Sequence, residues 1–218
     1  MHPAPAPYDL NQYQGIWDCP QGSVDRSHLF WLFDVLSSGG FQHALEIGCL
    51  NGASSTAFVE ALNAQAIERA TFCDIHLGAT FRGVLSRCRL PDRIQTFEGR
   101  SVELLRQQEN FDFVFIDGDH RLETVQEEVE LLLRQRPTCL MAHDTNAQAT
   151  GFADCEGPPL LKWRFQTTAP YFCLEDSAFR SGKATQRGMF LATTSPEIFA
   201  AARTSLEKWG TVGEVDSG

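Results

Sequence analysis

Short apolar runs alternate with helical patterns from about residue 25 to about residue 145. The most continuous run reads FVFI, residues 113–116, and is typical of a strand buried on both faces of a parallel sheet. Strands that alternate this regularly with helices indicate βαβ units with right-handed crossovers. We predict strands at 44–48, 70–75, 93–97, 111–116 and 138–142, and helices at 25–36, 53–64, 80–87, 101–108 and 121–134.

The pattern is less regular beyond residue 145. Residues 151–159 read as a loop and residues 160–167 as a short helix, and a closing helix spans 196–209. Residues 171–175 and 188–193 read as two strands, and such a pair after a parallel sheet often forms an antiparallel edge. The predicted fold class is therefore α/β, with a doubly wound, mostly parallel seven-stranded Rossmann-like sheet and an antiparallel C-terminal strand pair.

The chain shows no internal repeat and no linker that would divide it. Residues 1–24 begin MHPAPAPYDL and are expected to form a flexible, Pro-rich lead-in, so that residues 25–218 make a single domain. The run Leu29–Phe33 is too apolar for a fully exposed helix, and a homodimer interface is one expectation for it.

Charge and cysteine usage narrow the function classes. The net charge of −10 argues against nucleic acid as a partner, because phosphate binding needs clustered Lys and Arg. No stretch approaches the apolar length of a membrane span, and the N-terminus lacks a secretory layout. The seven cysteines stand singly, with no CxxC pair, and suit reduced thiols in a cytoplasmic protein.

The segment FVFIDGDH, residues 113–120, carries the strongest chemical signal. A buried parallel strand delivers the residues that follow it to the carboxyl edge of the sheet, where open α/β folds bind ligands. Here those residues include Asp117, Asp119 and His120, and carboxylates and imidazoles bind divalent metals and move protons. Asp119 is better explained as a cap of the helix that begins near residue 121.

Two further strand ends indicate a nucleoside ligand. The loop Glu46–Ser54 carries Gly48 and Gly52 in a GxxxG spacing, which allows a tight turn and close backbone approach but differs from the dinucleotide GxGxxG motif. Glu46 suits a ligand with a positive amino group or a network of polar donors. Asp74 ends the next strand, where an acid commonly accepts ribose hydroxyls, although a lone Asp there can also be a cap or a surface acid.

Together these residues resemble the class I S-adenosylmethionine (SAM)-dependent methyltransferases over about residues 25–193. The loop at 46–54 resembles their first motif, Asp74 their ribose-binding acid, and FEGRSVELL the segment that frames adenine. The resemblance is strongest to metal-dependent small-molecule O-methyltransferases of the catechol type and of the macrocin, mycinamicin and novobiocin sugar type. It implies a SAM site formed by Glu46, Gly48, Cys49, Gly52, Ser54, Asp74, Ile75, Gly99, Ser101 and Asp117.

The same resemblance implies the catalytic groups. Asp117 and Asp144 match metal ligands for Mg²⁺ or Mn²⁺, and His120 matches the general base. His143 stands where the family usually has an acid; it either joins the ligand set, which would favour Mn²⁺, Fe²⁺ or Zn²⁺, or points away. The implied acceptor is a hydroxyl of a small molecule, such as a sugar or a phenolic natural product. N- or C-methylation, and a non-catalytic SAM-binding partner subunit, remain the alternatives.

Overall fold

A seven-stranded sheet forms the centre of the domain. The computed structural model describes residues 8–13, 16, 24–107, 110–146, 155–176 and 188–210. The strand order is β3-β2-β1-β4-β5-β7-β6, and β7 runs antiparallel to both β5 and β6 while the other pairs are parallel. This confirms the predicted fold class. The strands are β1 (His43–Ile47), β2 (Arg69–Asp74), β3 (Ile94–Glu98), β4 (Phe113–Ile116), β5 (Cys139–His143), β6 (Phe172–Asp176) and β7 (Met189–Thr193).

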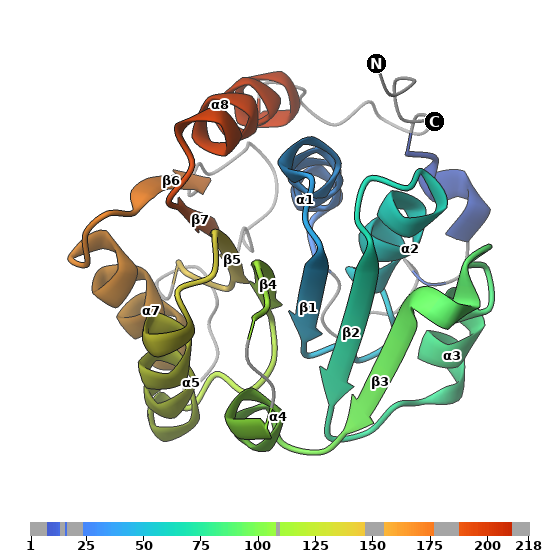
Figure 1. The fold of residues 1–218 in the computed structure, drawn as a ribbon, viewed down its shortest axis with the longest axis horizontal. Coiled ribbons are helices and arrows are strands. Elements are labelled where there is room, and N and C mark those ends of the chain that lie inside the picture. Colours follow the sequence, from blue (N-terminus) through green and yellow to red (C-terminus); the bar gives the residue numbers. More distant parts are fainter. Residues whose placement is uncertain are drawn as a thin grey trace.

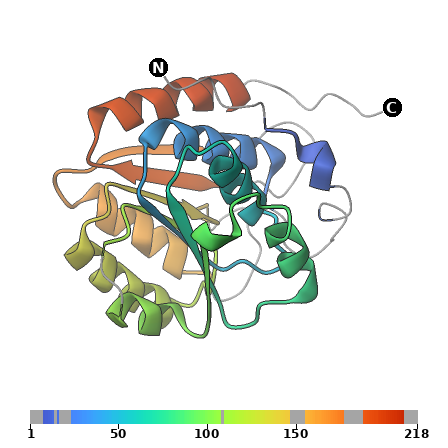
Figure 2. The same ribbon diagram turned by 45° about the vertical axis from the view of Figure 1, so that its right-hand side comes forward.

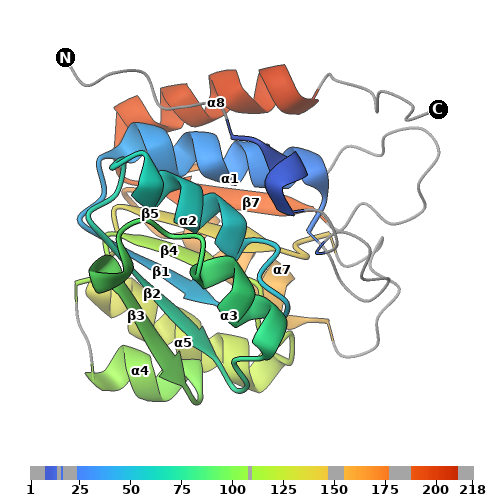
Figure 3. The ribbon, with the colours of Figure 1, turned by 90° about the vertical axis from the view of Figure 1, so that its right-hand side faces the viewer.

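Helices cover both faces of the sheet (Figures 1 and 3). One layer contains α1 (Arg26–Gly39), α2 (Ser55–Asn63), α3 (Ala79–Leu85) and α8 (Pro196–Gly210), and the other contains α4 (Ser101–Gln107), α5 (Leu122–Gln135) and α7 (Gly157–Gln166). Two short 3-10 turns are η1 (Leu10–Tyr13) and η2 (Pro91–Arg93). Each helix predicted before residue 145 forms within a few residues of its expected bounds, and so does the closing helix.

The central strand β4 is buried on both faces, as its apolar sequence predicts. Phe113 and Phe115 pack into the apolar core under α1 and α2, whereas Val114 and Ile116 pack into the core under α5. All four side chains are buried. A strand covered on both faces needs apolar residues at every position, which is the pattern of FVFI.

The apolar run on α1 is covered within the chain. Helices α1 and α8 lie side by side (Figure 2). The Trp31 indole Nε1 donates a hydrogen bond to the Ala202 carbonyl at 2.9 Å, and the Phe30 and Trp209 rings stack at 4.3 Å. The contacts with α8 therefore account for this run without a second subunit, and the homodimer stays a prediction.

Part of the expected lead-in is packed onto the domain. Tyr8 and Tyr13 are buried, the Tyr8 ring stacks on Phe33 at 4.8 Å, and the Tyr13 hydroxyl donates to Glu60 Oε1. The expectation of a flexible segment was wrong for residues 8–13. Prolines dominate residues 3–7, but the two tyrosines that follow bring enough apolar area to hold the segment in place.

Helix α7 begins earlier than predicted, because Gly157, Pro158 and Pro159 lie in it rather than in a loop. Proline has no N–H to donate, and the first turn of a helix leaves its N–H groups without intrahelical partners in any case. The two prolines therefore start this helix instead of preventing it. Within the described ranges, no helix is both long enough and apolar enough to cross a membrane.

Candidate active site

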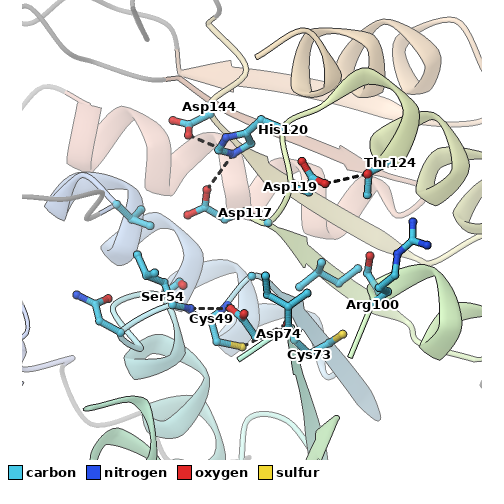
Figure 4. A pocket seen from close by; sticks show the side chains of 18 of the residues that line it. Cys49, Ser54, Cys73, Asp74, Arg100, Asp117, Asp119, His120, Thr124 and Asp144 are labelled. Atoms are coloured by element: carbon cyan, nitrogen blue, oxygen red, sulfur yellow. Dashed lines mark hydrogen bonds and ion pairs between the residues drawn. The ribbon is translucent and has the colours of Figure 1, made fainter. Parts of the chain in front are cut away.

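The carboxyl ends of β1, β2, β4 and β5 open into one cavity of about 660 Å³. Figure 4 shows two polar groups facing it, one around Asp74 and Cys49 and one around Asp117, His120 and Asp144. Most of the predicted SAM-binding residues line this cavity, whereas Glu46 and Gly52 are not among its lining residues. The lining residues from that prediction are Gly48, Cys49, Ser54, Asp74, Ile75, Gly99, Ser101 and Asp117.

Asp74 holds the glycine loop in shape. Its Oδ2 accepts hydrogen bonds from the backbone N–H groups of Cys49 at 2.7 Å and Leu50 at 2.9 Å, and its Oδ1 accepts one from His76 N–H at 3.0 Å. Leu50 has a positive φ of 43°, which an L residue adopts only with strain. A carboxylate has about four lone-pair sites, so Asp74 can hold the loop and still accept from a ligand hydroxyl.

Gly48 allows β1 and β4 to meet at the site. Its φ is +86°, and a Cβ there would lie 2.2 Å from the Asp117 carbonyl oxygen and 2.5 Å from the Gly118 Cα. The obstacles are backbone atoms, which no rotamer change can move. The glycine expected to allow a tight turn is therefore also the residue that lets the loop contact the strand end carrying Asp117.

We expect Gly48→Ala to lower the free energy of unfolding by about 3 kcal/mol or more, because it combines a strained φ with a backbone clash. The matched control is Gly83→Ala in the interior of α3, where an added Cβ meets nothing within 4 Å. Alanine there should stabilise by about 0.5–1 kcal/mol. Urea denaturation of both variants measures the difference, and equal stabilities would contradict this account of Gly48.

Glu46 lies beneath the loop rather than at the cavity surface. It is fully buried, its Oε1 accepts a hydrogen bond from the Ser54 hydroxyl, and its Oε2 has no hydrogen-bond partner among the described residues. Burial raises the pKa of the Glu46 carboxyl to about 8, although the Ser54 and Ser55 hydroxyls oppose the shift. Glu46 thus anchors the start of α2 under the cavity.

The far wall of the cavity combines apolar and polar surface. Ile75 lines the cavity and is 77% exposed, an unusual position for isoleucine. The Ser101 hydroxyl donates to the buried Glu128 carboxylate, and burial raises the pKa of Glu128 to about 7. The sequence analysis did not identify Glu128, since an acid on α5 resembles any polar helix position until the fold places it under Ser101.

Asp117, His120 and Asp144 form the second polar group (Figure 4). His120 Nε2 lies 3.3 Å from Asp144 Oδ2 and 3.7 Å from Asp117 Oδ1, and it has no hydrogen-bond partner among the described residues. The two carboxylates outweigh burial and raise the pKa of His120. Asp144 has a positive φ of 58°, and strain of this kind concentrates at functional sites.

His143 lies on the buried side of the same carboxylates. Its Nδ1 is 3.2 Å from Asp144 Oδ1 and 3.5 Å from Asp117 Oδ1. Burial lowers its pKa, but the two aspartates outweigh this effect and raise the pKa to about 10. In turn the imidazoles of His143 and His120 outweigh burial and hold the pKa of Asp117 below its usual range.

The ligand set that the structure brings together includes His120. Ligand atoms of Asp117, His120 and Asp144 lie within 4.8 Å of one another, close enough to coordinate a single divalent ion. His143 instead shares a second such set with two residues at the start of α1. The roles given to His120 as base and to His143 as ligand therefore remain predictions, and the experiments below separate them.

Asp119 supports the start of α5 but is not the helix cap that was expected, because Arg121 occupies the N-cap position. It accepts hydrogen bonds from the Arg121 backbone N–H at 3.1 Å and from the Thr124 hydroxyl at 2.8 Å, and its carboxylate also pairs with the Arg121 guanidinium. These bonds, those from Arg121 foremost, hold the pKa of Asp119 well below its usual range. Asp119 thereby secures the first turn of α5 and the position of His120 next to it.

Comparison with known proteins agrees with this geometry. Residues 45–145, which span β1 to the end of β5 and include both polar groups, match the family model of a methyltransferase domain. This part of the chain is therefore similar to a methyltransferase domain. No curated protein sequence matches the chain.

Several solved structures share the fold of this chain over most of its length. An O-methyltransferase from Bacillus cereus in complex with S-adenosylhomocysteine (SAH) is 19% identical, with a TM-score of 0.67 over 87% of this chain and 92% of that one. The O-methyltransferase TomG from Streptomyces achromogenes, in complex with SAM, is 16% identical, with a TM-score of 0.65 over 84% and 88%. A SAH-bound methyltransferase from Podospora anserina is 15% identical, with a TM-score of 0.63 over 84% and 86%. The resemblance to class I methyltransferases is thus confirmed.

Proposed function

We propose that the protein is a SAM-dependent O-methyltransferase that acts on a hydroxyl group of a small molecule. One observation carries the proposal: a single cavity joins the Asp74-anchored glycine loop to the Asp117–His120–Asp144 group. The first group suits a nucleoside cofactor, and the second suits deprotonation of an acceptor. Structural neighbours from Bacillus cereus and Streptomyces achromogenes are O-methyltransferases with SAH or SAM bound, which supports this choice.

The cofactor would lie along the glycine loop. Asp74 is placed to accept ribose hydroxyls with the acceptor sites that the loop leaves open, and the exposed Ile75 side chain offers an apolar face to the adenine ring. Gly99 and Ser101 would frame the base from the neighbouring strand end. Burying Ile75 against the ligand would remove an exposed apolar surface.

The acceptor would lie between the cofactor and His120. Its hydroxyl must lose a proton as the methyl group is transferred, and His120, which lines the cavity with its Nε2 between the Asp117 and Asp144 carboxylates, is the group proposed to accept it. Methyl transfer from a sulfonium needs little further chemistry, so the enzyme mainly positions the acceptor and takes its proton. The loops expected to define the acceptor, within 146–159 and 177–187, lie largely outside the described residues.

A divalent cation fits the donor set. Asp117 and Asp144 would hold it through carboxylate oxygens, the ligands that Mg²⁺ and Mn²⁺ prefer, and His120 or His143 would complete the set. When bound, such an ion acts as a Lewis acid that lowers the pKa of the acceptor hydroxyl. The natural acceptor class that we propose, a sugar or a phenolic natural product, follows from the resemblance to the metal-dependent enzymes.

The direct test is methyl transfer from isotope-labelled SAM to a panel of sugars, catechols and other phenols, with mass spectrometry of the products. The proposal requires SAH formation together with a product methylated on oxygen. A product methylated on nitrogen or carbon would favour the alternative reactions on this fold. SAM binding by calorimetry without turnover on any acceptor would favour a non-catalytic partner subunit.

Removal of divalent metal is expected to lower turnover strongly, because the ion would supply the positive charge that lowers the pKa of the acceptor hydroxyl. We expect excess EDTA to suppress the reaction and added Mg²⁺ or Mn²⁺ to restore it, with calorimetric affinity for SAH unchanged as the control. Full activity in excess EDTA would contradict metal assistance but not methyl transfer itself.

A further inference from the structure

A second cluster of metal-ligating residues lies behind the active site, and two of its three members, Asp25 and His28, have no role in the proposed reaction. Ligand atoms of Asp25, His28 and His143 lie within 4.8 Å of one another. Asp25 and His28 come from the start of α1, and His143 ends β5. We propose that these three residues bind a zinc-class transition metal ion, distinct from the ion proposed for Asp117 and Asp144.

Each of the two histidines has one ring nitrogen without a hydrogen-bond partner. His28 and His143 are almost fully buried, and neither His28 Nδ1 nor His143 Nε2 has a hydrogen-bond partner within the described part of the chain. Their rings approach edge to face at 5.4 Å. Buried polar groups are nearly always paired, so one unpaired nitrogen on each of two adjacent imidazoles indicates a missing ligand.

Each imidazole turns one nitrogen toward a carboxylate. His28 Nε2 lies 3.3 Å from Asp176 Oδ2, and His143 Nδ1 lies 3.2 Å from Asp144 Oδ1. Metal-binding histidines usually direct their second nitrogen to a carboxylate, which fixes the ring and raises its basicity. This arrangement leaves His28 Nδ1 and His143 Nε2 as the nitrogens available for an ion.

Asp25 supplies the third ligand. It occupies the N-cap position of α1, yet its side chain makes no capping hydrogen bond. Instead its buried Oδ2 lies 3.6 Å from His28 Nδ1, too far for a hydrogen bond. Ligand atoms that bind a tetrahedral zinc ion at about 2.0–2.2 Å lie about 3.4 Å from one another, close to this separation. Two nitrogens and one oxygen suit zinc better than magnesium, which prefers oxygen.

Such an ion would connect the start of α1 to the sheet. Val24, next to Asp25, lines the active-site cavity, and Asp176 behind His28 ends β6. Binding would therefore fix one wall of the cavity and stabilise the folded state, because the ligand set does not exist in the unfolded chain.

The test uses the metal-free full-length protein, zinc as the probe, and Asp25→Asn as the variant. Asparagine is an equally good N-cap, so the helix start should be unaffected while the charged ligand is lost. Asp34→Asn is the matched control, since it makes the same change on the same helix at a residue that binds Ser205 and Trp209 instead. Elemental analysis gives the zinc bound per chain, and thermal unfolding gives the zinc-induced rise in Tm.

We expect Asp25→Asn and His28→Gln to bind one zinc equivalent fewer than the wild type and to lose most of the zinc-induced rise in Tm. Asp34→Asn should keep both, and excess Mg²⁺ should not displace the ion. Wild-type zinc content and Tm shift in Asp25→Asn, or no zinc bound by the wild type, would overturn the proposal. Neither readout depends on methyl transfer, so this result is independent of the proposed reaction.

Discussion

Replacing His120 by alanine is expected to lower the rate of methyl transfer by about 10²–10⁴-fold, the usual contribution of a general base. Its Nε2 lies next to the cavity and between two carboxylates, at 3.3 Å from Asp144 and 3.7 Å from Asp117. The loop that would bind the cofactor is held by hydrogen bonds to Asp74 rather than to His120, so calorimetric affinity for SAH should stay within a few-fold of the wild type. Single-turnover kinetics at saturating SAM isolates the chemical step.

The control for this variant is His76→Ala, whose side chain is 80% exposed and should leave the rate unchanged. Metal binding distinguishes the two roles open to His120. If it is the base, His120→Ala binds Mn²⁺ as well as the wild type does while turnover falls. If Mn²⁺ affinity falls together with turnover, His120 is a metal ligand and a different group must take the proton. Unchanged turnover would exclude both roles.

The parts of the site that could be predicted from sequence are those set by local pattern. FVFI indicates a buried parallel strand at once, and a parallel sheet then places Asp117 beside the residues that end the neighbouring strands. Asp74, Asp117 and Asp144 could all be predicted in this way, because each lies at the carboxyl end of a parallel strand. The alternation of strands and helices predicts that parallel strands deliver these acids to one edge of the sheet, whereas the strand order that makes them neighbours comes from the structure.

The parts that could not be predicted depend on contacts between distant segments. His28 lies in an apolar helix and gives no sign that α1 will place it against His143, 115 positions along the chain from it. Glu128 likewise resembles any acid on α5 until α4 places Ser101 against it. Periodicity shows which face of a helix is apolar, but not which strand end its first turn will meet.

The orientation of the His143 side chain could not be predicted for the same reason. The sequence places His143 beside Asp144. It cannot show whether the imidazole is a metal ligand, because packing sets the direction of the side chain. In the structure its Nδ1 faces the active-site carboxylates while its ring lies against His28. His143 therefore lies between the two candidate metal sites. Its imidazole faces the carboxylate ligands of one site and the His28 imidazole of the other.

Replacing Asp74 by alanine is expected to weaken SAH binding by about 100-fold or more. The Asp74 carboxylate accepts two loop N–H groups at 2.7 and 2.9 Å, and hydrogen bonds to a charged acceptor contribute about 1.5–3 kcal/mol each. Without them the strained Leu50 conformation loses its support, and the ribose loses its acceptor. A loss of about 3 kcal/mol corresponds to about 100-fold in affinity.

Asp74→Asn tests the reason for this loss, since it keeps the shape and one acceptor oxygen but removes the charge. We expect it to bind SAH with intermediate affinity, about tenfold weaker than the wild type. Asp92→Ala, at an exposed acid in η2, is the control and should bind normally. Because Asp74 lies away from His120, turnover at saturating SAM should recover most of the wild-type rate, so the defect appears in KM rather than kcat. Wild-type affinity in Asp74→Ala would exclude Asp74 from the cofactor site, whereas a fall in kcat at saturation would show that the loop also positions the methyl group.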